Sequence, residues 1–177
     1  MRPRPQTNYL AGYPEALVQE LHELIEQGQF AKRLLQKYPA AHAVRTDRAL
    51  YDFVNQIKQD FLRNAAPLNR VAYDGSLQAM KRALGMHTGI SRVQGMKLKA
   101  SREIRVAPIF KQMPPEFLRM IAVHELAHFR EQEHNKAFYQ LCLHMEPEYH
   151  QLEFELRAYL TYLGASGEPL WPVAGVL

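Results

Sequence analysis

Two histidines and a glutamate between residues 124 and 128 have the spacing of a metal-binding helix. The segment reads H-E-L-A-H. On a helix, His124 and His128 lie one turn apart on the same face, so both imidazoles can bind one cation. Glu125 points to a neighbouring angle, from which it can reach a water molecule on that cation. The apolar residues 120–123 favour a buried helix that presents these side chains at the floor of a cleft. We therefore predict a metal site, with Glu125 as the catalytic base.

A catalytic zinc site usually has three protein ligands and one open position, so the two histidines need a partner. His134 follows His128 by six residues. A continuous helix would turn by about 600° over that distance, at about 100° per residue, and would place His134 on another face. The helix must therefore end within the polar residues 130–133, and Asn135 is a suitable N-cap for a new helix. We predict His134 as the third ligand, and the alternatives are three downstream carboxylates: Glu148, Glu153 and Glu155.

Residues 114–139 resemble the zinc-metallopeptidase domain of the YgjP-like family, which is similar to SprT-like proteases. The resemblance is carried by the ligand motif, a third histidine and an aromatic pair: His124, Glu125, His128, His134, Phe138 and Tyr139. It extends over about residues 86–163. Two positions depart from the family pattern, because Glu133 stands where asparagine is frequent and Tyr139 where tryptophan is frequent. Neither change removes a ligand.

This resemblance implies a zinc-dependent peptidase with Zn²⁺ as the cofactor and a peptide or protein as the substrate. In that chemistry zinc activates a water molecule and polarises the scissile carbonyl, and Glu125 carries the proton to the leaving amine. A donor beside the metal would stabilise the oxyanion. The residues leave four candidates for this donor: Tyr139, Tyr149, His150 and Arg157. A strand expected at 103–107 could hold an extended peptide by strand addition.

The elements that must position these residues are mostly helices. Apolar residues at three- and four-residue spacing, with proline and capping residues at the starts, predict seven helices. They are expected from residue 14 to 28, 29 to 39, 46 to 61, 77 to 84, 114 to 128, 135 to 146 and 149 to 163. Strands are expected at 90–98 and 104–107, joined by a turn, with further strand character at 70–73.

The expected fold is therefore one α+β unit, mostly helical with a small antiparallel sheet, of a minimal zincin-like type. Residues 1–85 are predicted to form a helical N-terminal region of the same compact unit. Residues 86–177 are predicted to form the zincin-like metallopeptidase domain. We find no composition change that would indicate a linker between the two regions.

Composition narrows the class of protein. The chain has 177 residues, of which 47% are hydrophobic and 23% charged, as in an ordinary globular protein. Its single cysteine, Cys142, excludes an intrachain disulfide and a zinc ribbon built from several cysteines. No run approaches the roughly 18 apolar residues of a membrane span, and no secretory signal is visible. We expect a cytoplasmic protein with no membrane partner.

The excess positive charge is concentrated in the middle of the chain. Residues 81–111 contain eight Lys and Arg residues and a single acid, Glu103, within a chain of net charge +4. Such a segment could attract phosphate or nucleic acid, although basic runs are weak motifs and we do not predict a nucleic-acid partner. It favours an alternative function, a metal-dependent hydrolase of nucleotides or other phosphoanhydrides. A non-enzymatic binding protein is a third possibility, but a structural metal site would not need Glu125.

Overall fold

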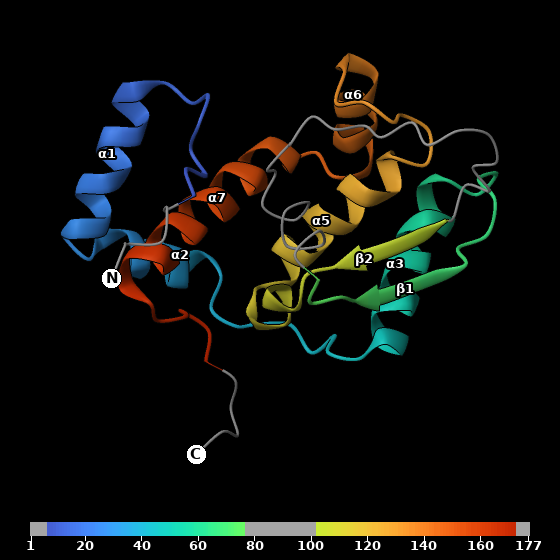
Figure 1. The fold of residues 1–177 in the computed structure, drawn as a ribbon, viewed down its shortest axis with the longest axis horizontal. Coiled ribbons are helices and arrows are strands. Elements are labelled where there is room, and N and C mark those ends of the chain that lie inside the picture. The colour runs from blue at the N-terminus through green and yellow to red at the C-terminus, as the bar shows by residue number, and fades with distance from the viewer. Residues whose placement is uncertain (1–6, 77–101, 173–177) are drawn as a thin grey trace.

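The computed structural model describes residues 7–76 and 102–172 (Figure 1). This described part of the chain contains six α-helices, one short 3-10 helix and two strands. The helices are α1 (Glu15–Glu26), α2 (Gln29–Lys37), α3 (Asp47–Phe61), η1 (Pro108–Gln112), α5 (Pro115–Ala127), α6 (Lys136–Met145) and α7 (Tyr149–Ser166). No helix in these two ranges combines the length and the apolar character needed to cross a membrane.

Local signals in the sequence set the helix boundaries. Gly28 separates α1 from α2 with a φ of 69°, a conformation that glycine adopts at little cost. The hydroxyl of Thr46 caps α3 by accepting a hydrogen bond from the backbone N–H of Ala49 (3.2 Å). The amide oxygen of Asn135 caps α6 in the same way, from Phe138 N (2.9 Å). The predicted helices within the described ranges are confirmed, whereas the helix predicted at 77–84 lies outside them.

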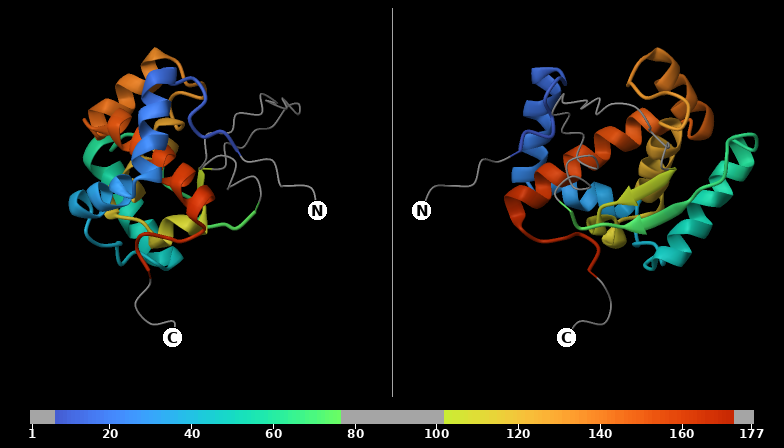
Figure 2. Two further views of the ribbon diagram at one scale, coloured as in Figure 1. Left: turned by 90° about the vertical axis from the view of Figure 1, so that its left-hand side faces the viewer. Right: turned by 45° about the vertical axis from the view of Figure 1, so that its right-hand side comes forward.

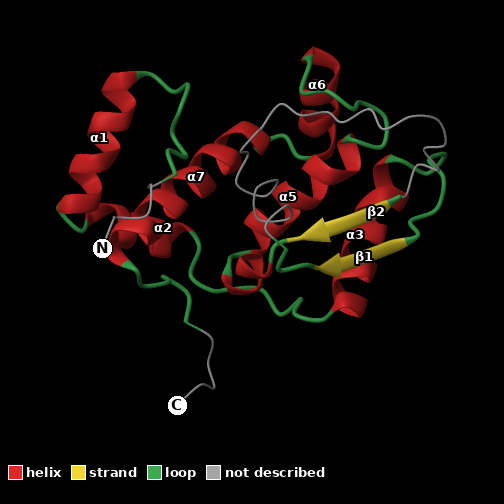
Figure 3. Ribbon diagram, viewed as in Figure 1, coloured by secondary structure: helices red, strands yellow, loops and turns green. Residues whose placement is uncertain are grey.

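The sheet is parallel, so our prediction of an antiparallel sheet is wrong. Strand β1 (Arg70–Tyr73) pairs with β2 (Glu103–Val106), and both arrows point the same way in Figure 3. Parallel neighbours need a connection of a dozen or more residues, and residues 74–102 provide it. We had instead paired the second strand with its neighbour in sequence at 90–98, which lies outside the described residues.

Helices cover one face of this sheet. Ile104 and Val106 of β2 are buried, whereas Arg105 between them is exposed, as expected for a strand with one covered face. Helix α3 packs along β1 and α5 contacts β2. Both helices lie behind the strands in Figure 1, and the side view in Figure 2 places the sheet at one edge of the molecule.

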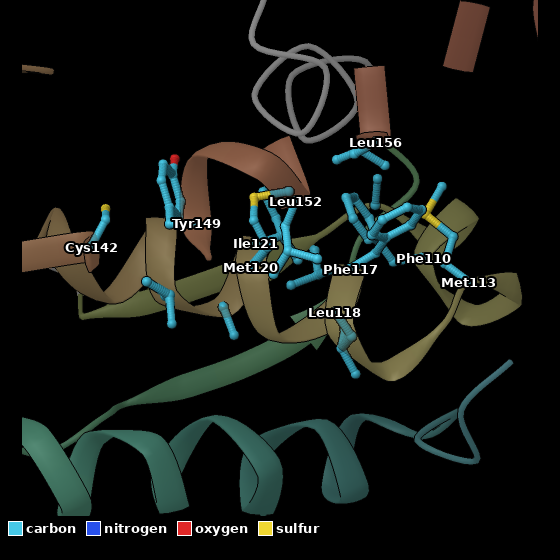
Figure 4. Close-up of a cluster of buried hydrophobic side chains, with 14 of the residues drawn as sticks. Phe110, Met113, Phe117, Leu118, Met120, Ile121, Cys142, Tyr149, Leu152 and Leu156 are labelled. Atoms are coloured by element: carbon cyan, nitrogen blue, oxygen red, sulfur yellow. The ribbon is translucent and has the colours of Figure 1, made fainter. Parts of the chain in front are cut away.

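Helix α5 is the central helix. It contacts α3, α6, α7 and β2, and eight of its 13 residues are buried. Figure 4 shows its inner side chains, such as Phe117 and Ile121, packed against Leu152 and Leu156 of α7 and against Phe110 of η1. The helix that carries the H-E-L-A-H segment is therefore held from several sides before its last turn reaches the site.

Candidate metal centre

The end of α5 and the loop after it bring the predicted ligands together. Helix α5 ends at Ala127, and His128 is its C-cap residue. The chain then turns through residues 129–135, so that His134 comes back to the same helix end before α6 begins. The predicted break between His128 and Asn135 is confirmed.

Three ring nitrogens converge at this point. The Nε2 atoms of His124 and His128 are 3.3 Å apart, and that of His134 lies 3.2 Å from the first and 3.1 Å from the second. Nitrogens bound at about 2.0–2.1 Å to one tetrahedral Zn²⁺ lie roughly 3.3–3.4 Å from each other. The triangle therefore has nearly the size that one such cation requires. Within the described residues, these three half-buried histidines form the group that could hold a metal ion.

The other ring nitrogen of His128 indicates which nitrogen faces the cation. Its Nδ1 lies 3.0 Å from the carbonyl oxygen of Glu131, which can only accept. Nδ1 therefore carries the hydrogen and Nε2 presents a lone pair to the other two imidazoles. Nitrogen lone pairs turned toward one another repel, and a cation between them converts that repulsion into coordination. The donor set thus fits a divalent metal.

The Nδ1 atom of His124, the ring nitrogen on the outer side, also has a hydrogen-bond partner. Its Nδ1 lies 2.7 Å from the hydroxyl oxygen of Tyr149, the first residue of α7. Sequence reasoning had considered Tyr149 only as a donor to the substrate. The structure instead places its fully buried hydroxyl behind a ligand. No spacing rule could have found this contact, because the two residues lie 25 positions apart on different helices.

Phe138 forms an apolar wall behind the three imidazoles. Its ring centroid lies 5.0 Å from that of His124, 4.7 Å from that of His128 and 4.6 Å from that of His134. The Phe138 side chain is fully buried on α6. Tyr139, its partner in the aromatic pair, is half-buried with its ring 6.4 Å from that of His134. The aromatic pair therefore packs around the ligands.

The predicted base and the alternative carboxylates have different positions. Glu125 is half-buried on α5, directly after His124. Glu155 accepts hydrogen bonds from Lys37, the last residue of α2, and from Tyr38, its C-cap residue, at 2.6 and 2.5 Å. Glu148 is exposed before α7. The third alternative, Glu153, pairs with Arg157 at 3.2 Å. The structure places none of these three carboxylates in the group that could hold a metal.

The other candidate oxyanion donors are also placed. Arg157 pairs with Glu153 and donates to the carbonyl oxygen of Tyr9 (3.1 Å), so its guanidinium is held on the N-terminal segment. His150 is exposed, and its ring lies 5.4 Å from that of Tyr139. Tyr139 and Tyr149 are the two candidates whose rings lie near a candidate ligand, at a centroid distance of 6.4 Å in each case.

The structure describes only part of the basic segment 81–111. Five of its eight Lys and Arg residues lie at 81–99, outside the described ranges. Arg105 pairs with Asp74 (2.9 Å) and Glu103 (3.2 Å), and Lys111 lies over the ring of Tyr73 (4.7 Å). Arg102 differs, because its Nη1 is buried and makes no hydrogen bond in the described part of the chain.

Comparison with known proteins places the chain in a family. A sequence model described as "YgjP-like, metallopeptidase domain" matches residues 22–159. The chain belongs to the YgjP-like family. The match begins within α1 and ends in α7, so the family covers helices well upstream of the segment in which we noted the resemblance.

Members of this family include a curated protein with high similarity. A protein of Escherichia coli (strain K12) named UTP pyrophosphatase is 56% identical over 155 residues, which are 88% of this chain and 93% of that protein. No solved structure matches significantly. The YgjP-like family and the three-histidine cluster together support a metal-dependent hydrolase.

Proposed function

We propose that this protein is a metal-dependent nucleotide pyrophosphatase that hydrolyses UTP to UMP and pyrophosphate. The observation that carries the proposal is the 56% identity, over nearly the whole of both chains, to a protein named UTP pyrophosphatase. The substrate is then a nucleotide and not the peptide expected from the motif. Water attacks the α-phosphorus, the bond to the bridging oxygen breaks, and pyrophosphate leaves.

Three residues would hold the metal in this proposal. His124, His128 and His134 supply three imidazole nitrogens, a donor set that suits zinc, which we propose as the ion. When bound, such an ion polarises a phosphoryl or carbonyl oxygen and lowers the pKa of a water molecule. The outer contacts of the first two histidines keep their Nε2 lone pairs directed inward. Phe138 excludes water from one side of the rings.

Glu125 acts as the general base. Its carboxylate follows the first ligand on α5, and a half-buried carboxylate at that position can take a proton from the attacking water. The proton then passes to solvent or to the departing pyrophosphate. Positive charge for the triphosphate is available from the segment 81–111, and Arg102 is its described member with an unsatisfied buried nitrogen.

A second candidate function is peptide hydrolysis. The H-E-L-A-H helix with a third histidine is the signature of zinc peptidases, and the family model carries that description. Strand β2 has β1 on one side only within the described residues, so its other edge could take an extended peptide. In this case Glu125 would pass its proton to the leaving amine.

One experiment separates the two functions. Zinc-loaded wild type and Glu125→Gln are incubated with UTP and, separately, with an unfolded protein. We expect pyrophosphate release from UTP by the wild type, a loss of about 10²–10⁴-fold in Glu125→Gln, and no cleavage of the protein. The matched control is Glu116→Gln, which changes an exposed glutamate in the first turn of the same helix and should leave the rate unchanged.

Two results would contradict the proposal. Cleavage of the protein without turnover of UTP would make the enzyme a peptidase. Full activity of Glu125→Gln on UTP would show that another group takes the proton.

A further inference from the structure

We propose that Tyr149 is a positioning residue that holds His124 as a metal ligand. It would touch neither the metal nor the substrate. It would act through the imidazole of His124, by fixing its orientation and its tautomer. The inference rests on the metal site of the proposed function but not on the choice between nucleotide and peptide.

The contact between α7 and α5 supplies the geometry. Tyr149 begins α7 and is fully buried, and its hydroxyl oxygen lies 2.7 Å from Nδ1 of His124. The two rings are stacked at a centroid distance of 6.4 Å with an interplanar angle of 16°. A buried hydroxyl on a packed helix has a single position, so its contact with Nδ1 fixes the orientation of the His124 ring.

The direction of this hydrogen bond follows from the surroundings of His124. A tyrosine hydroxyl has one hydrogen to donate and lone pairs with which to accept. Nε2 of His124 lies 3.3 Å from Nε2 of His128 and 3.2 Å from Nε2 of His134, so a cation held between them needs the lone pair of this nitrogen. The hydrogen of the neutral imidazole is then on Nδ1, and the hydroxyl oxygen of Tyr149 accepts it.

The test is the zinc affinity of Tyr149→Phe, measured by competition with a chromophoric chelator. Removal of an outer partner of a liganding histidine typically weakens metal binding by about 10–100-fold, and we expect a loss in this range. The matched control is Tyr159→Phe, which removes another buried hydroxyl from the same helix, one that accepts from Leu170 N (3.4 Å) far from the ligands in sequence. Tyr159→Phe should keep the wild-type zinc affinity.

A second measurement keeps the test decisive. Nitrogen chemical shifts of His124 in the metal-free protein should report the Nδ1–H tautomer in the wild type and a mixture of tautomers in Tyr149→Phe. The wild-type spectrum carries the test if Tyr149→Phe fails to fold.

The outcomes distinguish this inference from the proposed function. Wild-type zinc affinity in Tyr149→Phe, or an Nε2–H tautomer of His124 in the metal-free wild type, would overturn the inference and leave the metal site intact. Equal losses in Tyr149→Phe and Tyr159→Phe would also overturn it, because the effect would then be one of stability. If the wild type binds no zinc, both the inference and the proposed function fail.

Discussion

Phe138 places an apolar side chain against the candidate metal centre. Its ring contacts all three imidazoles, and it is fixed on α6 by complete burial. Imidazoles that are packed against a rigid wall lose little freedom when a cation binds, which favours binding. The site is therefore largely formed by packing before any metal arrives.

Arg102 allows a residue-level test of phosphate binding. Within residues 7–76 and 102–172, its buried Nη1 has no hydrogen-bond partner, which costs folding free energy, and a phosphate oxygen would satisfy it. We expect Arg102→Met to raise KM for UTP by about tenfold, while the thermal unfolding temperature stays equal or rises. Steady-state kinetics and a thermal melt measure the two effects.

The control for this prediction is Arg48→Met. Arg48 is highly exposed on α3, where it forms an i,i+4 pair with Asp52. Arg48→Met should change neither the KM for UTP nor the thermal unfolding temperature. An unchanged KM in Arg102→Met together with a gain in stability would assign Arg102 no part in binding.

Sequence reasoning identified the three candidate ligands, which lie together in the structure, but not the atoms behind them. The spacing of His124 and His128 is a property of one helical turn, and the need for a break before His134 follows from helix geometry. The carbonyl of Glu131 and the hydroxyl of Tyr149 are placed by loop shape and by packing of distant helices. No local pattern encodes either contact.

At the level of elements, the boundaries were predictable and the strand pairing was not. Capping residues and prolines act within a few residues of the helix ends that they specify, as at Thr46 and Asn135. The partner of β2 lies about thirty residues upstream, and a parallel pair leaves no turn signal in the sequence. A strand at the position of β2 could therefore be predicted from the sequence, but the strand that pairs with it could not.

Asn135 links an element boundary to the site, because it caps α6 and directly follows His134. Asn135→Ala removes the acceptor for Phe138 N and should lower the free energy of unfolding by about 1 kcal/mol. It should also weaken zinc binding several-fold, since the loop that carries the ligand is no longer fixed at its end. Urea unfolding of the metal-free protein and chelator competition measure the two effects.

Thr46→Ala provides the comparison for this cap. It removes the equivalent cap of α3, with a similar cost in stability, but it should leave zinc affinity unchanged. If both variants weaken zinc binding equally, the cap of α6 has no specific role at the site.

At the scale of the whole molecule, His42 joins the N-terminal helices to the central region. This buried histidine lies between α2 and α3, and its Nε2 is 2.7 Å from the carbonyl oxygen of Phe110 in η1. Its Nδ1 accepts from Val44 N (3.0 Å), so the ring is neutral with its hydrogen on Nε2. The backbone N–H of His42 donates to the carbonyl oxygen of Met113 (3.0 Å).

This histidine makes stability depend on pH. Burial lowers the pKa of His42 below its ordinary value of 6.5, and the nearby Arg45 lowers it further, although the bond to Phe110 opposes this. Below pH 6.5 the unfolded chain therefore takes up a proton that the folded protein excludes, and the free energy of unfolding falls as the pH drops. Above pH 6.5 this contribution is fully present.

We expect the difference in the free energy of unfolding between wild type and His42→Gln to become smaller as the pH is lowered from 7.5 to 5.5. The amide of the variant can still donate to Phe110 O but does not titrate. Urea unfolding of both proteins without metal measures the gap, and the site histidines cancel because both proteins have them. A gap that stays constant would show that His42 does not titrate in this range.

The lone cysteine of the chain is a built-in reporter of motion beside the metal centre. Cys142 is fully buried on α6, where this helix meets α7, and its raised pKa keeps it protonated at neutral pH. A thiol reagent can reach it only when the two helices separate. Its labelling rate therefore measures how often α6 and α7 separate, and no engineered probe is needed. A bound metal that connects α5 to the loop before α6 should lower this labelling rate.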